Sequence, residues 1–288
     1  IQGTVSPGFE PVREAFDIEQ ALENTDHYWR EFSDRCPDVG PWTAQVKRSL
    51  ITLKAMTYAP TGGIVAAVTT SLPEQLGGER NWDYRFCWLR DATMTLLAFM
   101  NLGYFDEATA WRNWLLRSVA GNPEQVQIMY GLGGERRLPE YQLPWLSGYE
   151  NSQPVRIGNA AATQMQLDVY GEVADAMTQA LKSGLPRLPR STEIQKVIMP
   201  FLENVWHQPD AGIWEIRSEP RHFTHSKVMA WVSFDRNAGV LAQSDSAEDR
   251  ERGRHYRAIA DEIHADVCAN GYDAQLGSFV QTYGGKEL

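Results

Sequence analysis

The sequence predicts an all-α protein in which inner and outer helices alternate around a ring, an α/α toroid. Two observations predict this fold class. Segments that are apolar nearly all round alternate with segments that carry one apolar stripe. The turns also recur, because "DAGIWEIR" from Asp210 is echoed by "DAQLGSFVQT" from Asp273, about 60 residues later. A helical bundle would not need this alternation, so a ring explains the pattern better.

The N-terminal part is predicted to be a linker followed by two helices. The opening "IQGTVSPGFEPVREA" is polar, contains prolines and is typical of a linker. In residues 17–36, Ile18, Leu22 and Trp29 share one face at helical spacing. A second helix is expected over residues 44–56, before the turn residues of "APTGG".

From Arg90 onward we expect three inner helices, each followed by an amphipathic outer helix. The inner segments are residues 90–103, 158–181 and 226–242. The outer segments are residues 105–119, 192–206 and 248–269. In the first outer helix, the residues predicted to face inward are Phe105, Ala108, Trp111 and Leu115, whereas Arg112 is predicted to face water. The last outer helix is expected to bury only Tyr256, Ile259, Ile263 and Val267.

The connections that lead from an outer helix to the next inner helix are long. About 40 residues separate Val119 from Gly158, and loops of that length in compact domains usually serve a function. The connections from inner to outer helices are short. All long loops therefore leave one end of the ring, where we expect the functional site.

Composition excludes several classes of protein. The formal net charge of −10 argues against a nucleic-acid partner, which would require a basic surface. No apolar run is long enough to span a membrane, and no signal segment is visible. Cys36, Cys87 and Cys268 are widely spaced and are typical of reduced thiols. We therefore predict a cytoplasmic protein with no membrane partner.

The first candidate site is the stretch "RNWDYRFCWLRDA", which spans Arg80–Ala92. Arg90 can donate hydrogen bonds to a polyhydroxy ligand while Asp91 accepts them, and Trp88 offers an apolar face to a sugar ring. The alternative is a helix start, with Asp91 in the first turn and local Arg–Asp pairs. Residue types alone leave both interpretations open.

The second candidate is the pair Trp214–Glu215, which follows a turn and lies outside any helical pattern. A carboxyl held against an apolar wall has a raised pKa, and glycoside hydrolysis needs such a protonated acid beside the leaving oxygen. The alternative is a loop glutamate that is simply solvated.

The sequence predicts no metal site and no cofactor. His222 and His225 could share a metal, but no Glu or Cys completes a zinc pattern, so structural roles are favoured. The stretch "GLGGERR" resembles a dinucleotide motif, but Leu138 and Pro139 follow it where that motif needs a helix.

Three stretches resemble the bacterial branch of glycoside hydrolase family 15. They are "SLPEQLGGERNWDYRFCWLRDA", "LPWLSGYENSQPVRIGNAA" and "GIWEIRSEPRHFTHSKVMAWVSFDR", and the likeness extends from about Asp17 to the end. The family contains glucoamylases, glucodextranases and mycobacterial-type trehalases. The resemblance implies an (α/α)6 barrel preceded by a β-sandwich, and hydrolysis with inversion of the anomeric carbon.

The resemblance also implies roles for individual residues. Glu215 matches the general acid of the family, and Trp214 matches the aromatic residue that precedes it. The residues that match contacts to the sugar are Trp88, Arg90, Asp91 and Trp214. Arg156 and Asn159 match further contacts through the stretch "PVRIGN", which is a weaker correspondence.

Two departures from the family pattern refine the expectation. Ile216 stands where typical glucoamylases carry a second carboxylate, which favours trehalose or another small α-glucoside. The general base of the family lies on a late loop, and no matching segment precedes Leu288. About seven helices are recognisable where the barrel needs twelve. We expect an incomplete (α/α)6 toroid over residues 44–288, preceded by a linker and helix at 1–43 and by a missing β-sandwich.

These observations predict an inverting, exo-acting α-glucoside hydrolase that releases glucose from trehalose or a gluco-oligosaccharide. The alternative is a non-catalytic module that binds an α-glucoside, because the base is not recognisable in this sequence. The sequence gives no indication of the oligomeric state.

Overall fold

The computed structural model describes residues 17–288, which form two compact units. One unit ends at Ala55, and the other runs from Met56 to Leu288. The predicted linker lies mostly in residues 1–16, outside the described residues. The candidate site residues all belong to the larger unit.

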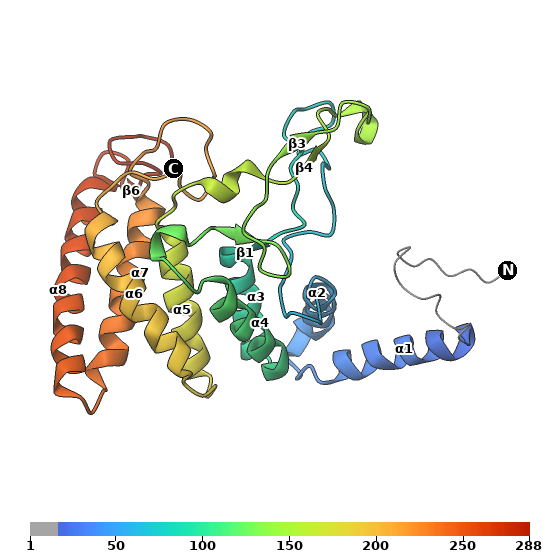
Figure 1. Cartoon of the computed structure of the whole chain (residues 1–288), viewed down its shortest axis with the longest axis horizontal. Coiled ribbons are helices and arrows are strands. Elements are labelled where there is room, and N and C mark those ends of the chain that lie inside the picture. Colours follow the sequence, from blue (N-terminus) through green and yellow to red (C-terminus); the bar gives the residue numbers. More distant parts are fainter. Residues whose placement is uncertain (1–16) are drawn as a thin grey trace. The chain divides into compact units, whose positions relative to one another are not determined.

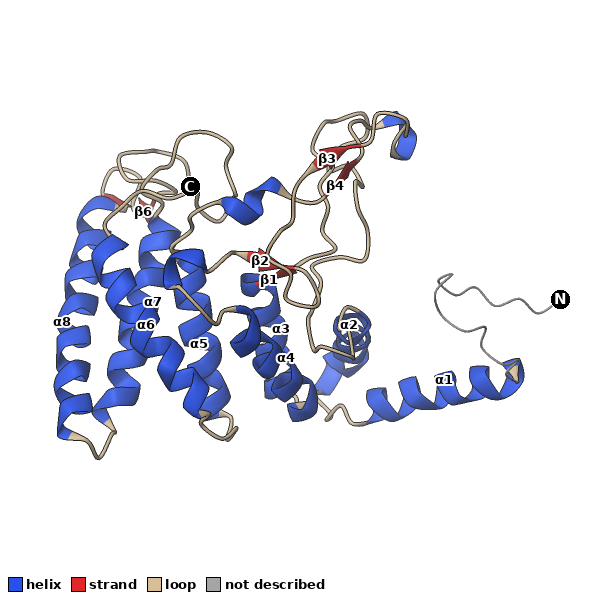
Figure 2. Ribbon diagram, viewed as in Figure 1, coloured by secondary structure: helices blue, strands red, loops and turns tan. Residues whose placement is uncertain are grey.

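Helices dominate both units (Figure 2). The α-helices are α1 (Ile18–Asp34), α2 (Thr43–Ala55), α3 (Leu89–Asn101), α4 (Phe105–Ser118), α5 (Asp168–Lys182), α6 (Pro189–Val205), α7 (Thr224–Ala242) and α8 (Ala247–Asn270). Short 3-10 helices span Gly40–Trp42, Pro123–Gln125, Tyr149–Asn151 and Ala160–Thr163. The strands are β1 (Cys87–Trp88), β2 (Met129–Tyr130), β3 (Tyr141–Gln142), β4 (Arg156–Ile157), β5 (Tyr272–Asp273) and β6 (Ser278–Phe279). They form three antiparallel pairs, β1–β2, β3–β4 and β5–β6.

The smaller unit confirms the two predicted helices. Asp17 caps α1, because its carboxylate accepts hydrogen bonds from the backbone N–H groups of Glu19 and Gln20. On the face that Ile18, Leu22 and Trp29 were expected to share, Ile18 and Leu22 are exposed. The only buried residue of α1 is Phe32, near the end where α1 meets α2.

The larger unit contains three helix pairs in the predicted order (Figure 1). The inner helices contact one another in sequence, α3 with α5 and α5 with α7. Each outer helix packs on the inner helix before it, so the pairs are α3/α4, α5/α6 and α7/α8. The four residues predicted to be buried in α8, Tyr256, Ile259, Ile263 and Val267, are buried, but Gly253 and Ala260 are buried as well, so the expected stripe was too narrow. This alternation is the local unit of an α/α toroid.

Three details of the helix predictions are wrong. Phe105, at the first position of α4, is exposed, whereas Arg112 is buried and donates from Nη1 to the Pro186 carbonyl at 2.8 Å. A buried guanidinium is tolerated where it satisfies a carbonyl from the loop before the next outer helix. The helix expected from Gly158 begins only at Asp168, because the Ala160–Thr163 segment forms a separate 3-10 turn. Met94 of the first inner helix is exposed.

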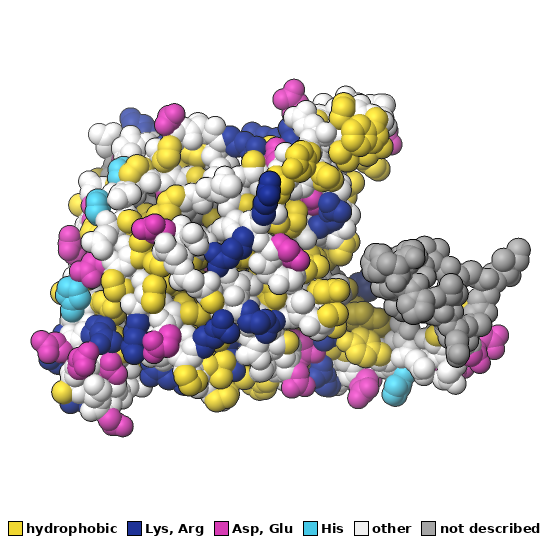
Figure 3. Space-filling model, viewed as in Figure 1, with side chains coloured by type: hydrophobic (Ala, Val, Ile, Leu, Met, Phe, Trp, Pro, Cys, Tyr) yellow, Lys and Arg dark blue, Asp and Glu magenta, His cyan; other side chains and the backbone are white. Residues whose placement is uncertain are grey.

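Exposed apolar side chains gather around the β3–β4 hairpin (Figure 3). They include Tyr141, Trp145, Leu146 and Tyr149. No helix within residues 17–288 is both long enough and apolar enough to cross a membrane.

Candidate active site

A cavity of about 1050 Å³ opens among the loops that precede the inner helices of the larger unit. The predicted residues that line it are Trp88, Arg90, Asp91, Asn159, Trp214 and Glu215. The three sequence stretches that carried the family resemblance therefore meet around one space, at the end of the helices where the long loops were expected to place it. Arg156 is the one predicted site residue that does not line this cavity.

The loop from Asp210 to Arg221 presents Glu215 to the cavity. Asp210 and Arg221 close the loop through two mutual backbone hydrogen bonds of 2.9 Å. Gly212 has a φ of 67° and packs against Phe223, and Glu215 itself has a φ of 53°. A non-glycine residue in the left-handed region stores strain, which is typical of functional sites.

Gln164 holds the same loop from the segment before α5. Its Nε2 donates to the carbonyl oxygens of Glu215 at 3.3 Å and Ile216 at 2.9 Å. The backbone around Glu215 is thus fixed by a side chain from another part of the chain. No feature of the sequence indicated this role of Gln164.

The carboxyl of Glu215 is partly desolvated and has two neighbours from the first candidate stretch. Trp88 Nε1 donates to Glu215 Oε1 at 2.6 Å, and Arg90 Nη2 lies 3.9 Å from the same oxygen. The side chain of Glu215 is 20% exposed. Burial raises its pKa above the ordinary value, although the hydrogen bond from Trp88 and the charge of Arg90 act in the opposite direction. The two candidate sites are therefore one site.

The indole that contacts the carboxyl of Glu215 belongs to Trp88. Trp88 is buried and is held by the pairing of β1 with β2, where it faces Met129. Trp214, which the sequence placed as the wall for Glu215, lines the cavity with a side chain that is 68% exposed. Trp214 can therefore offer an apolar face to a ligand, while Trp88 supplies the hydrogen bond.

Arg90 and Asp91 form an ion pair at the start of α3. Arg90 Nε lies 3.0 Å from Asp91 Oδ1, and Arg90 Nη1 donates to the Ile213 carbonyl at 3.3 Å. The local Arg–Asp pair expected at a simple helix start is thus present, but both side chains also line the cavity. An Arg–Asp pair that remains accessible can donate to and accept from sugar hydroxyls.

Asn159 and Arg156 have structural partners. The side chain of Asn159 is buried, accepts from the Ala161 N–H at 3.0 Å and so caps the 3-10 helix. The Arg156 guanidinium lies 4.5 Å from the centre of the Trp82 ring, and its Nη1 donates to the Glu79 carbonyl at 2.7 Å. Arg156 does not line the cavity itself, but it contacts Trp82, which does.

Further residues of this site were not identified from the sequence. Tyr84 lines the cavity with its ring centre 5.8 Å from that of Trp88, and Glu74 and Arg217 also line it. Tyr84 lies inside the quoted stretch Arg80–Ala92, so its position could have been noticed. Behind Arg90, α5 buries Glu172, whose pKa is raised to about 8 by desolvation and by nearby carboxylates.

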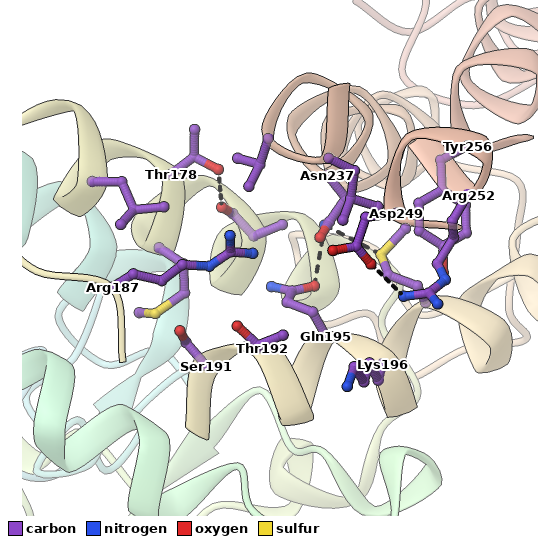
Figure 4. Close-up of a pocket in the computed structure, with 16 residues that line it drawn as sticks. Thr178, Arg187, Ser191, Thr192, Gln195, Lys196, Asn237, Asp249, Arg252 and Tyr256 are labelled. Atoms are coloured by element: carbon purple, nitrogen blue, oxygen red, sulfur yellow. Dashed lines mark hydrogen bonds and ion pairs between the residues drawn. The ribbon is translucent and has the colours of Figure 1, made fainter. Parts of the chain in front are cut away.

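A second, much smaller cavity of about 60 Å³ lies between α5, α6, α7 and α8 (Figure 4). Its polar side chains bond to one another, with Asn237 Nδ2 donating to Gln195 Oε1 at 3.1 Å and Arg252 Nη1 to Asp249 Oδ1 at 3.4 Å. Within residues 17–288, no group of three or more His, Cys, Asp or Glu side chains is placed to hold a metal ion.

Comparison with protein families and curated relatives agrees with this geometry. The model described as Glycosyl hydrolases family 15 matches residues 41–288. The chain is 43% identical to a trehalase of Mycolicibacterium smegmatis, over 98% of this chain and 42% of that protein. It is 36% identical to a trehalase of Thermoplasma volcanium, over 93% of this chain and 42% of that protein. The chain thus spans less than half the length of these relatives.

Solved structures show the same fold at low sequence identity. A structure titled "Glycosidase Wild Type" matches with a TM-score of 0.60 and 15% identity, over 90% of this chain and 62% of that chain. A glucoamylase from Saccharomycopsis fibuligera matches with a TM-score of 0.54 and 15% identity, over 91% of this chain and 53% of that chain. Such glucoamylase-like proteins form an (α/α)6 toroid, and the three helix pairs of the described residues are part of that architecture.

Proposed function

The chain belongs to glycosyl hydrolase family 15, and from that premise we propose that it carries the acid-bearing part of an inverting, exo-acting α-glucoside hydrolase. Glu215 is the general acid of this reaction. Arg90 and Asp91 hold the terminal glucose at the inner end of the cavity, together with Trp88. Trp214 contributes an apolar face near the acid.

In the proposed reaction, Glu215 transfers its proton to the glycosidic oxygen as the bond from that oxygen to the anomeric carbon breaks. A water molecule attacks the anomeric carbon from the opposite face and gives its proton to a second carboxylate, the base. The products are glucose and the protonated leaving group. Inverting enzymes of this kind separate the two carboxyl groups by roughly 6.5–9.5 Å, which leaves room for the water.

The environment of Glu215 is the observation that supports this role most directly. A general acid must be protonated near neutral pH and must still reach the substrate. Burial raises the pKa of Glu215, while its carboxyl stays at the wall of the cavity beside Arg90. The short hydrogen bond from Trp88 fixes which way the carboxyl points.

The substrate we propose is trehalose or another small α-glucoside. Ile216 lines the cavity next to the acid, so this wall lacks the second carboxylate of typical glucoamylases. The relatives from Mycolicibacterium smegmatis and Thermoplasma volcanium are both named trehalases, which supports the same substrate class. We place the reaction in the cytoplasm, because Cys36, Cys87 and Cys268 are free thiols. A purely binding module is less favoured, since this family consists of hydrolases.

The experiment that tests this function is the substitution Glu215→Gln in the complete enzyme, which contains this chain together with the base. Glutamine keeps an oxygen for the Trp88 hydrogen bond but has no proton to transfer, so trehalose hydrolysis should fall by about 10³-fold or more. Hydrolysis of α-glucosyl fluoride should fall far less, because fluoride leaves with little help from an acid. Binding of glucose, measured by calorimetry, should persist.

The matched control is Glu172→Gln, which makes the same chemical change at a buried glutamate that does not line the cavity. Turnover of trehalose by Glu215→Gln at near the wild-type rate would remove Glu215 from the role of acid. Equal losses on trehalose and on the fluoride would show that Glu215 acts in some other way.

A further inference from the structure

Arg217 and Trp82 form a polar wall of the cavity that the proposed function has not yet used. Both residues line the cavity, and the Arg217 guanidinium lies 4.4 Å from the centre of the Trp82 ring. Arg217 follows Glu215 by two positions on the same loop. A guanidinium over an indole is a favourable cation–π arrangement that restricts the arginine to one orientation.

Glu140 and Arg156 hold this wall from outside the cavity. Glu140 Oε2 accepts from Arg217 Nη2 at 2.7 Å, Glu140 Oε1 accepts from Nη1 at 3.3 Å, and Arg156 Nε lies 3.5 Å from Oε1. The Ala160 N–H also donates to Glu140, at 3.1 Å. Two oxygens that face two nitrogens form the forked geometry that orients a guanidinium most strongly.

These contacts are poorly explained by stability alone. The Arg217 side chain is 43% exposed, and ion pairs at such exposed positions contribute little to stability. Glu140, by contrast, is mostly buried, so the chain accepts the cost of desolvating a carboxylate to hold an exposed arginine. A positioned arginine at a cavity wall is typical of ligand recognition.

The exposure of the two arginines indicates which part of the substrate each one meets. Arg90 is 21% exposed, whereas Arg217 is 43% exposed and therefore closer to solvent. An exo-acting enzyme places the terminal sugar at the closed end of its cavity, so the leaving group extends from the acid toward solvent. Arg217 thus lies on the leaving-group side of Glu215.

We infer that Arg217 donates hydrogen bonds to the hydroxyl groups of the leaving sugar, and that Glu140 and Arg156 are positioning residues for Arg217 and Trp82. A guanidinium has five N–H donors, and Glu140 engages only two of its nitrogens. The wall therefore favours a hydroxyl-bearing leaving group, such as the second glucose of trehalose, over an apolar aglycone. This inference rests on the proposed function.

The test compares two substrates that share the glucosyl group but differ in the leaving group. In the complete enzyme, Arg217→Ala should lower kcat/KM for trehalose by about 10- to 100-fold, the effect of losing hydrogen bonds to a charged group. For α-glucosyl fluoride, which has no leaving sugar, kcat/KM should change by less than about threefold. Arg217→Lys should restore little, because lysine lacks the planar fork. Arg137→Ala, at an exposed arginine that lies on the loop of Glu140 and does not line the cavity, should match the wild type.

The positioning role of Glu140 is tested by a double-mutant cycle. Glu140→Gln should raise KM for trehalose more than it lowers kcat, and it should have little further effect in the Arg217→Ala background. Additive effects would overturn the positioning role. Equal losses on both substrates in Arg217→Ala would overturn the leaving-group role while leaving the proposed function intact. Hydrolysis of neither substrate by the complete wild-type enzyme, which contains this chain together with the base, would instead contradict the proposed function.

Discussion

Two of the cavities in the larger unit lie at opposite ends of its helices and differ in how their polar groups are used. The cavity of about 1050 Å³ adjoins the loops before α3, α5 and α7. The cavity of about 60 Å³ lies between the C-terminal halves of α5 and α7 and the N-terminal halves of α6 and α8. In the small cavity, Gln195 bonds to Asn237 and Arg252 to Asp249, so its side chains satisfy one another.

At the loop end, by contrast, charged groups are brought together and still face open space. Glu215, Arg90 and Asp91 lie within one cavity, and the backbone at Glu215 is held in the left-handed region. The difference indicates that helix packing stabilises the unit while the loops arrange the chemistry. A loop site needs its own supports, which here are Gly212, Gln164 and Trp88.

The largest effect is expected from Gly212→Ala, which changes the loop that carries Glu215. A Cβ at this position would lie 2.4 Å from the ring of the buried Phe223, at a φ of 67°. The loop must move, and a shift of about 1 Å in a catalytic group can lower the rate by about 100-fold. We expect trehalose hydrolysis to fall at least that far, with a loss of about 3 kcal/mol of stability or more. Kinetic assays and urea denaturation measure the two effects.

Gly277→Ala is the matched control for that substitution. Gly277 has a φ of 65°, but a Cβ there would meet no atom within 4 Å. It should cost about 1–2 kcal/mol of stability and leave kcat/KM close to the wild type. Similar kinetic losses in both variants would show that the acid loop does not depend on the fit between Gly212 and Phe223.

A smaller effect, confined to stability, is expected from Glu172→Gln, which changes a buried side chain of helix α5. Burial raises the pKa of Glu172 to about 8, whereas its value in the unfolded chain is near 4.5. Between these values the native state holds a proton that the unfolded state has lost. Stability therefore falls as the pH rises from 4.5 to 8, by at most about 1.4 kcal/mol per pH unit from this residue.

Glutamine cannot lose a proton, so the variant should show a shallower fall. Urea denaturation at several pH values between 5 and 8 measures the slope. Identical slopes in the wild type and the variant would mean that Glu172 is ionised in the native state. The basic limb of the activity profile should stay in place, because we assign that limb to Glu215, the proposed acid.

The smallest effect is expected from Trp88→Phe, which acts on the pH dependence of activity. The Trp88 N–H stabilises the ionised form of Glu215 and so lowers its pKa. Its removal should raise that pKa further. Since the acid must be protonated, the basic limb of the kcat/KM profile should move to higher pH.

Trp214→Phe is the control that distinguishes the loss of this hydrogen bond from the loss of any indole near Glu215. Trp214 is next to Glu215 in sequence, but the indole that donates to the carboxyl is that of Trp88. Its substitution should leave the basic limb where it is, even if the rate falls. A basic limb that moves to lower pH in Trp88→Phe would contradict the assigned hydrogen bond.

Much of the fold could be predicted from the sequence because helix periodicity is a local property. The alternation of apolar and striped segments predicted all three helix pairs, and the four residues predicted to be buried in α8 are buried, together with Gly253 and Ala260. The errors occurred where tertiary contacts overrule the local pattern. Arg112 is buried because the Pro186 carbonyl, about 74 residues away, needs a donor. Phe105 is exposed because it occupies the first turn of α4, where the apolar face of the helix is incomplete.

The candidate site could likewise be predicted where it depends on local sequence, but not where it depends on tertiary contacts. Residue types and the family resemblance predicted Trp88, Arg90, Asp91, Trp214, Asn159 and Glu215, and the structure places these six residues around one cavity. The sequence could not predict that the indole on the acid belongs to Trp88 and not to Trp214, which is adjacent in the chain. Nor could it predict that Arg156 supports Trp82 from behind, since that contact joins residues about 74 positions apart.

The sequence by itself determined the helical class, the order of the helix pairs and the identity of the acidic and aromatic residues at the site, because these depend on local spacing and side-chain chemistry. The tertiary structure decided which side chains meet, how far Glu215 is desolvated and which arginine lies near solvent. Those properties depend on distances between segments remote in the chain, and a pKa or a hydrogen bond exists only once these segments have packed together.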